Sequence, residues 1–216
     1  MMSNILSAIS FAANHFFTCA QLLTIVLLVT QVVRKKFNLV RFGVNYIFLF
    51  YMLCVISLVF FPLPTMTGDV SQSVGLQAIP FHFVSDIIRE TSFVWNQPKT
   101  YLMAICDRAV LQVVFNVIMT VPFGMYLRYD FHFDGKKVAV ASFLLSSFIE
   151  IAQFTGLFFM FSSAYRLCDV DDLMANTLGG VMGYVVVRAV EKRIPAVADI
   201  ERFDITRKAG KILINA

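Results

Sequence analysis

Charge and cysteine motifs are both scarce in this sequence, and each shortage excludes a class of protein. Charged residues make up 15% of the 216 positions, whereas about a quarter of a soluble domain is charged. No CxxC pair occurs among the four cysteines, which are Cys19, Cys54, Cys106 and Cys168. That spacing predicts neither a disulfide framework nor a zinc site, and we expect no metal and no cofactor. The sequence also lacks a low-complexity linker, so we expect one domain.

Long hydrophobic runs take the place of the missing charge. Hydrophobic residues make up 58% of the chain, and the mean hydropathy is +0.74. A helix of about 20 apolar residues crosses the ~30 Å hydrocarbon core of a membrane. Five such runs lie at about 11–33, 42–61, 109–127, 138–154 and 170–190. The sequence therefore predicts an all-α, polytopic helical integral membrane protein with five transmembrane helices.

The basic residues indicate how the chain is oriented in the membrane. Cytoplasmic connections carry an excess of Lys and Arg. Fourteen Lys and Arg lie in 34–41, 128–137 and 188–216, and the opposite connections hold three, at Arg89, Lys99 and Arg166. This bias predicts an outside N-terminus and a cytoplasmic C-terminus. It also accounts for the net charge of +4, so we expect no nucleic-acid partner.

The one long polar connection, 62–100, falls on the outer side in this topology. Within it, Phe83 and Ile87, with Ile88 as a further candidate, lie on one face of a helix, and charged residues lie elsewhere. This pattern predicts a short amphipathic helix on or in the outer leaflet. Trp95 and Tyr101 suit the interfacial belt of a membrane protein.

Polar residues form a stripe on the third predicted span. Gln112, Asn116 and Thr120 are spaced four residues apart, so they share one helical face. Such a stripe normally points at another helix, where its side chains form hydrogen bonds. Pro122 and Gly124 follow it, and we expect them to loosen or kink the last turns of the span.

The facing ends of the fourth and fifth spans hold the densest group of polar residues. Glu150 and Gln153 are three residues apart and share a face of the fourth span. Asp169 is placed to cap the N-terminus of the fifth span, with Asp172 at the third helical position, which resembles a capping box. Charged residues inside a membrane normally face protein, water or a ligand. This group is therefore the candidate functional site.

One face of the fifth span continues this group. Asp172, Asn176, Gly179 and Gly183 follow one another at helical spacing. The two glycines form a small-xxx-small pair, which lets another backbone approach closely. The spacing predicts that the fourth and fifth spans pack together around an outward-opening pocket, over which Arg166 closes as a cationic partner. The residues around this pocket would be Glu150, Gln153, Asp172 and Asn176.

Four interpretations of this polar group are open from the residues alone. In the first, Arg166 pairs with Asp169 or Glu150, and the amides only join helices. In the second, Glu150, Asp169 and Asp172 bind a divalent metal through their oxygens. In the third, Glu150 acts as an acid or base in an intramembrane enzyme. In the fourth, the group binds a polar headgroup or a glycan.

Three motifs occur in one order along the chain. They are Ile79-Pro80-Phe81; Asn116 with Val121-Pro122-Phe123-Gly124; and Glu150-x-x-Gln153 followed by Tyr165-Arg166-x-x-Asp169-x-Asp171-Asp172-x-x-x-Asn176-x-x-Gly179-Gly180-x-x-Gly183. Together they resemble the signature of the VanZ-like membrane proteins. Two positions depart from it: Tyr165 stands where the family usually has Gly, and Gln77 where an Asn commonly precedes the Ile-Pro-Phe run.

The resemblance divides the chain into three parts and implies a cellular location. Two N-terminal transmembrane helices and the start of the outer loop occupy 1–75, a VanZ-like core occupies 76–190, and a basic cytoplasmic tail occupies 191–216. The implied location is the bacterial cytoplasmic membrane. The family's founding member is an accessory determinant of teicoplanin resistance, which is a phenotype rather than a reaction, so no enzymatic activity follows.

The resemblance also implies a set of binding residues and partners. The polar positions carried over from the family would be Asn116, Glu150, Gln153, Arg166, Asp169, Asp172 and Asn176. The expected partners are membrane lipids and a lipid-linked cell-wall precursor or lipoglycopeptide, bound at the outward-facing pocket.

Overall fold

The computed structural model describes residues 2–34, 39–61, 75–91, 94, 96–161, 164 and 166–193. Trp95, Tyr165, residues 62–74 and residues 194–216 lie outside these described residues. The chain divides into two compact units. The first unit consists of Met1–Phe61, Tyr129–His132 and Val187–Ala216, and the second of Pro62–Arg128 and Phe133–Val186.

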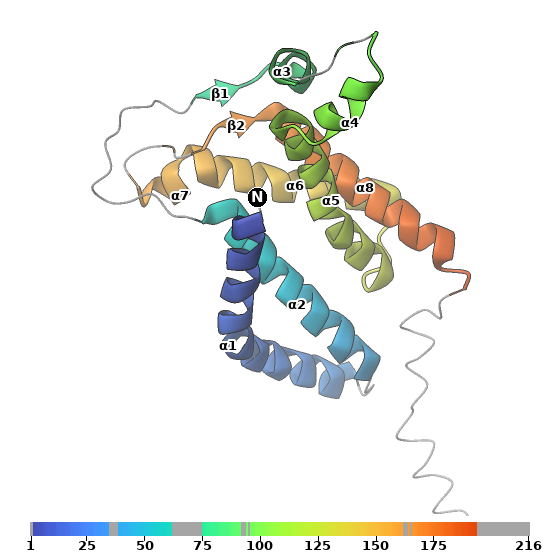
Figure 1. The fold of residues 1–216 in the computed structure, drawn as a ribbon. Helices are drawn as coiled ribbons and strands as arrows, with labels where there is room; N and C mark the ends of the chain where they lie inside the picture. Colours follow the sequence, from blue (N-terminus) through green and yellow to red (C-terminus); the bar gives the residue numbers. More distant parts are fainter. Residues whose placement is uncertain are drawn as a thin grey trace, which may run out of the picture. The chain divides into compact units, whose positions relative to one another are not determined.

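Five long helices confirm the predicted all-α membrane architecture (Figure 1). They are α1 Met2–Arg34, α2 Leu39–Phe60, α5 Arg108–Tyr129, α6 Gly135–Phe154 and α8 Val170–Val190. Each contains a run that is long and apolar enough to cross a membrane. The first helix begins at Met2 rather than near residue 11, because no glycine or proline interrupts the residues before the apolar run. The orientation of the five helices stays a prediction.

In the first unit, α1 packs along α2 through aromatic and polar contacts. The Phe16 ring lies edge-on against the rings of Tyr46 and Phe50, with centroids 6.3 and 5.9 Å apart. The hydroxyl groups of Thr24 and Tyr46 share a hydrogen bond of 2.6 Å. These contacts pair the two helices along their apolar faces.

An ion pair within the first unit joins α2 to the connection between α5 and α6. Arg41 Nε lies 3.3 Å from Asp130 Oδ1, and the two side chains are 20% and 3% exposed. Arg41 Nη2 donates a hydrogen bond of 3.4 Å to Asp130 Oδ2. Because the ion pair and the hydrogen bond hold both side chains, they give the connection a defined position.

The second unit carries two short strands that sequence patterns did not predict (Figure 1). β1, Leu76–Gln77, pairs in parallel with β2, Cys168–Asp169. Leu76 lies opposite Cys168, and Gln77 lies opposite Asp169. The pairing brings the connection before α3 onto the residues that lead directly into α8.

Two short helices follow β1 in the same unit. α3, His82–Glu90, confirms the predicted amphipathic helix, and α4, Lys99–Ile105, precedes α5. Phe83 and Ile87 are half-buried, whereas Ile88 is 66% exposed and does not share their surroundings. We refer to residues 75–91, which contain β1 and α3, as the outer segment, after the side of the membrane on which the sequence predicts them to lie.

Glycines allow α8 to lie close to both α5 and α6. A Cβ atom at Gly179 or at Gly183 would collide with the backbone of α5. Gly180 instead faces Ser142 of α6, and its own carbonyl oxygen lies against Gly124 of α5. The close backbone approach predicted for Gly179 and Gly183 is present, and the helix that approaches them is α5, the third predicted span. α8 contacts α6, the fourth predicted span, at Gly180.

The ends of α5 and α6 clarify two details of the spans. Pro122 lies inside α5, and the helix continues past it to Tyr129. α6 ends at Phe154, and the following turn, α7 at Gly156–Phe159, has a left-handed backbone with φ of 63° at Gly156 and 54° at Leu157. Thr155 Oγ1 accepts a 3.0 Å bond from Phe158 N at this turn. The apolar run beyond Phe154 is therefore not an extension of the fourth span.

Candidate functional site

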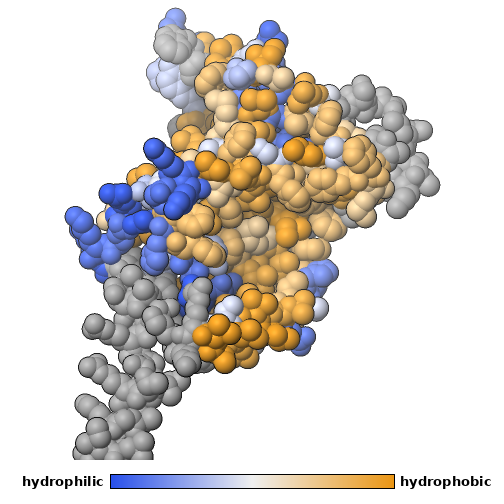
Figure 2. All heavy atoms as spheres, turned by 180° about the vertical axis from the view of Figure 1, so that it is seen from behind, coloured by the Kyte–Doolittle hydropathy of each residue, from blue (hydrophilic) through white to orange (hydrophobic). Residues whose placement is uncertain are grey.

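α6 has a buried polar face, while several of its large apolar side chains are exposed. Ser142, Ser146 and Glu150 recur every four residues and are only 1%, 1% and 3% exposed, and Gln153 one turn further is 5% exposed. Val138, Ile149 and Ala152 are buried with them. The exposed apolar side chains of the helix include Val140, Phe143, Leu144, Phe148 and Ile151. Hydrophobic residues also cover much of the molecular face in Figure 2. This reversed polarity suits a helix surrounded by hydrocarbon, in which polar groups need partners inside the protein.

Glu150 contacts the chain just before α8. Its Oε2 atom accepts a hydrogen bond of 3.0 Å from the backbone N–H of Asp169. The carboxylates of Asp169 and Asp172 are its electrostatic neighbours. The predicted proximity of Glu150 and the start of the fifth span is thus present, although the link runs through a backbone group.

Asp169 caps α8, as its position before the helix predicts. Its Oδ1 atom accepts a bond of 2.8 Å from the backbone N–H of Asp171, the second residue of α8. Burial raises the pKa of the Asp169 carboxyl above 3.8, and the negative charges of Asp171 and Asp86 add to this effect. The hydrogen bond from Asp171 and the nearby His82 ring act in the opposite direction.

Asp172 points to α5, whereas a capping box would direct its side chain back to the start of α8. Its Oδ1 atom accepts a hydrogen bond from Asn116 Nδ2. The Gln112 side chain also interacts with this carboxylate. The stripe predicted on the third span therefore faces α8, and two of its three members meet the same acid.

Asn176 joins α8 to both neighbouring helices. Its Nδ2 atom donates a bond of 2.9 Å to Ser146 Oγ on α6, and its backbone oxygen accepts one of 2.8 Å from Thr120 Oγ1 on α5. The Asn176 side chain is 3% exposed, and its Oδ1 atom has no hydrogen-bond partner among the residues that the structure describes. We refer to Asn116, Glu150, Asp169, Asp172 and Asn176 as the polar cluster.

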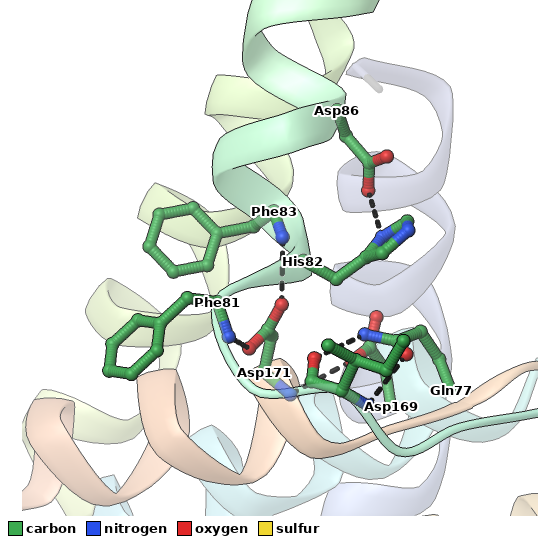
Figure 3. A network of polar contacts seen from close by, with 8 residues as sticks. Gln77, Phe81, His82, Phe83, Asp86, Asp169 and Asp171 are labelled. Carbon is green, nitrogen blue, oxygen red and sulfur yellow. Dashed lines mark hydrogen bonds and ion pairs between the residues drawn. The ribbon is translucent and has the colours of Figure 1, made fainter.

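Asp171 is the member of this region that sequence reasoning missed. It is 5% exposed, and its two carboxylate oxygens accept bonds of 2.6 Å from Phe81 N and 2.8 Å from Phe83 N (Figure 3). These donors belong to the start of α3, ninety residues earlier in the chain. No local pattern could distinguish Asp171 from its acidic neighbours, because its role depends on a contact with a distant segment.

Gln77 and His82 order the same part of the outer segment (Figure 3). Gln77 Nε2 donates a 2.7 Å bond to the Ile79 oxygen, and Ile79 N donates a 2.8 Å bond to Gln77 Oε1. His82 Nδ1 lies 3.0 Å from Asp86 Oδ2, one turn further along α3. Gln77 thus shapes the turn before α3.

Two further expectations concern Arg166 and a metal ion. Arg166 is half-exposed and lies two residues before β2, and its predicted role as a cover for the pocket stays a prediction. Among the described residues, no three His, Cys, Asp or Glu side chains are grouped so that they could hold a metal ion. Glu150, Asp169 and Asp172 therefore do not form such a group.

Cys168 completes the surroundings of Glu150. Burial raises the pKa of its thiol from 9.0 to about 11, and the negative charge of Glu150 adds to this effect. The thiol is half-buried and lies opposite Leu76 in the ladder. Cys168 therefore lies where the outer segment meets the residues around Glu150.

Comparisons with known proteins identify the family of this chain. No curated protein and no solved structure matches the chain. The sequence profile of the VanZ/LLP1 family matches residues 48–191, which include most of α2 and all of the second unit that the structure describes. This match covers two thirds of the 216 residues. The chain belongs to the VanZ/LLP1 family.

Proposed function

We propose that this protein acts in the bacterial cytoplasmic membrane and contributes to teicoplanin-type glycopeptide resistance by binding an amphiphilic ligand at the polar cluster. The ligand is a lipid-linked cell-wall precursor, a lipid headgroup or a lipoglycopeptide, all of which combine a polar head with an apolar tail. Family membership supports a general association with the envelope and with resistance. The ligand-binding step is the proposal.

The observation that carries the proposal is the burial of Glu150 inside a membrane-spanning helix. A charged side chain inside a transmembrane helix costs up to roughly 2.5–3.5 kcal/mol on insertion scales, the value at the helix centre, so such residues are rare and usually functional. Glu150 lies four residues from the end of α6. Glu150 is 3% exposed, and its electrostatic neighbours Asp172 and Asp169 are also acidic. Burying several carboxyl groups between helices costs free energy, and apolar residues of similar size would hold the helices together as well or better.

The polar cluster also offers groups that recognise a polar head. Asn116 and Asn176 carry amides, and Asn176 Oδ1 is a buried acceptor for which the described part of the chain provides no donor. Amides and carboxylates placed at the end of a helix bundle can bind the hydroxyl, amide or ammonium groups of a ligand. The apolar tail of the ligand would then lie in the surrounding lipid, along the exposed apolar side chains of α6.

The test compares three variants with the wild-type protein in cells challenged with teicoplanin. Glu150→Gln, Arg166→Ala and Asp172→Asn are produced at equal membrane levels, with Glu90→Gln as a control because Glu90 is exposed on α3. We expect the three variants to lose protection and the control to retain it. Equal protection by all three would show that the polar cluster is only structural.

A further inference from the structure

The outer segment is attached to the protein at the residues that surround Glu150. Cys168 N donates a 3.4 Å bond to the Gly75 oxygen, and the ladder continues from there. Asp169, whose N–H binds Glu150, pairs with Gln77 in the same ladder. β2, whose backbone binds the buried Glu150, thus also pairs with β1.

Asp171 provides the second attachment, at the start of α3. The first N–H groups of a helix have no partner within the helix and need one from elsewhere. Phe81 occupies the N-cap position and supplies no side-chain hydrogen bond. The Asp171 carboxylate, coming from α8, accepts the N–H groups of Phe81 and Phe83. It replaces the missing cap and fixes α3 to α8.

Beyond these attachments, α3 is held weakly. None of its residues is buried, and Val84 and Ile88 are 44% and 66% exposed. Segments with few buried contacts open at a small cost in free energy, so they supply the moving parts of binding sites. Glu150, at 3% exposure, is closed to a ligand while the strand carrying Asp169 and the outer segment stay in place.

We propose that the outer segment is a lid on the polar cluster, that Asp171 is its latch, and that the lid lifts to admit the ligand. This inference rests on the ligand-binding function proposed above. Asp171 is then a positioning residue, since it holds the lid and need not touch the ligand.

The native Cys168 thiol can report on the lid without any ligand. A thiol with a pKa of about 11 holds about 100-fold less reactive thiolate at pH 8 than one at the ordinary value of 9.0. Lifting the outer segment would expose Cys168 to water and return its reactivity towards the ordinary level. The measurement uses full-length protein in lipid nanodiscs, with Cys19, Cys54 and Cys106 replaced by alanine. Iodoacetamide labelling of Cys168 is followed over time.

Two variants weaken the latch from opposite sides. Asp171→Asn removes the charged acceptor, and Phe83→Pro removes one donor at a position where the first turn of a helix tolerates proline. Both should label about 10- to 100-fold faster at Cys168. Phe83→Leu, which keeps the N–H group, and Glu90→Gln, which alters an exposed acid on α3, should label at the wild-type rate.

Only preparations that elute as a single species in gel filtration are compared. If Asp171→Asn misfolds, the Phe83→Pro variant alone tests the proposal. Wild-type labelling rates in both latch variants would overturn the proposal, because the outer segment would then be held by something else. Equal acceleration in Phe83→Leu and Phe83→Pro would overturn it too, since loss of the Phe83 ring would explain both.

A second experiment asks whether the lid must lift for binding. Leu76→Cys places a thiol opposite Cys168, and a short, reductant-cleavable thiol cross-linker then fastens β1 to β2. Teicoplanin binding to nanodiscs is measured before cross-linking, after it, and after reduction. We expect at least a tenfold loss that reduction reverses, and unchanged binding would overturn the lid. If the protein does not bind teicoplanin even before cross-linking, teicoplanin is not its ligand. The labelling rates at Cys168 then test by themselves whether Asp171 holds the outer segment in place.

Discussion

Glu150 Oε2 accepts its hydrogen bond from the backbone N–H of Asp169, nineteen residues later in the chain. The acid lies on α6, and the N–H belongs to the strand that leads into α8. Asp169 in turn caps α8 through Asp171 N. A side chain inside one membrane helix therefore positions the beginning of another. Changes at Glu150 should affect both the site and the packing of the second unit.

Replacement of Glu150 can separate these two roles. Glu150→Gln keeps an oxygen that can accept the Asp169 N–H, so we expect a loss below about 1 kcal/mol in the free energy of unfolding. Glu150→Leu leaves that N–H without an acceptor and should cost about 1–3 kcal/mol. Unfolding in mixed detergent micelles measures both. Equal stability of the Gln and Leu variants would contradict a structural role for this bond.

The glycines of α8 predict a marked difference between two alanine substitutions. Gly183→Ala places a Cβ against the backbone of α5, which cannot move aside as a flexible side chain can. We expect a loss of about 1–3 kcal/mol in the free energy of unfolding. Gly43→Ala in α2 is the matched control, because no atom lies within 4 Å of its Cβ position. That control should be neutral or gain up to about 1 kcal/mol from helix propensity.

The ion pair of the first unit predicts a rescue by double substitution. Arg41→Gln leaves the 3%-exposed Asp130 carboxylate without its cation, which should cost about 1–3 kcal/mol in the free energy of unfolding. Asp130→Asn in the same chain removes the unpaired charge and should restore part of this loss. A double-mutant cycle in detergent measures the coupling. Additive losses would show that the two residues act independently.

Asp169 predicts a pH dependence of stability. Because its pKa is raised in the folded protein, the folded state binds the proton more tightly than the unfolded state does. The resulting stability is fully present below 3.8, the ordinary value, and is lost as the pH rises through the raised pKa. Thermal unfolding of wild type and Asp169→Asn is compared from pH 7 down towards 4. The thermal stability of the wild type relative to the variant should increase as the pH falls. A stability difference that does not change with pH would contradict the raised pKa.

Sequence patterns predicted the parts of this fold that depend on local properties. Hydrophobic length identified the five spans, and Asp169 was recognised as a cap because it precedes an apolar helix. The face of Ser142 and Ser146 was missed, although it follows from extending the face of Glu150 back in steps of four residues. Serine is common in membrane helices, so this spacing alone does not indicate a buried face.

The rest of the site depends on contacts that leave no local pattern. The ladder between β1 and β2 has only two residues on each side, too few for an alternating pattern. Asp171 acts on backbone N–H groups, which every residue except proline carries, so the sequence of α3 gives no indication of its partner. The left-handed turn after Phe154 has a glycine only at its first position, and the apolar residues that follow resemble a longer span.

The ladder between β1 and β2 also has a consequence for biosynthesis. Leu76 is made 92 residues before its partner Cys168. At about 5–20 residues per second, roughly 5–20 seconds of translation separate them. During that interval α5 and α6 are synthesised, while β1 and the start of α3 lack the strand and the carboxylate that later hold them. This ladder therefore cannot form until most of the second unit has been synthesised.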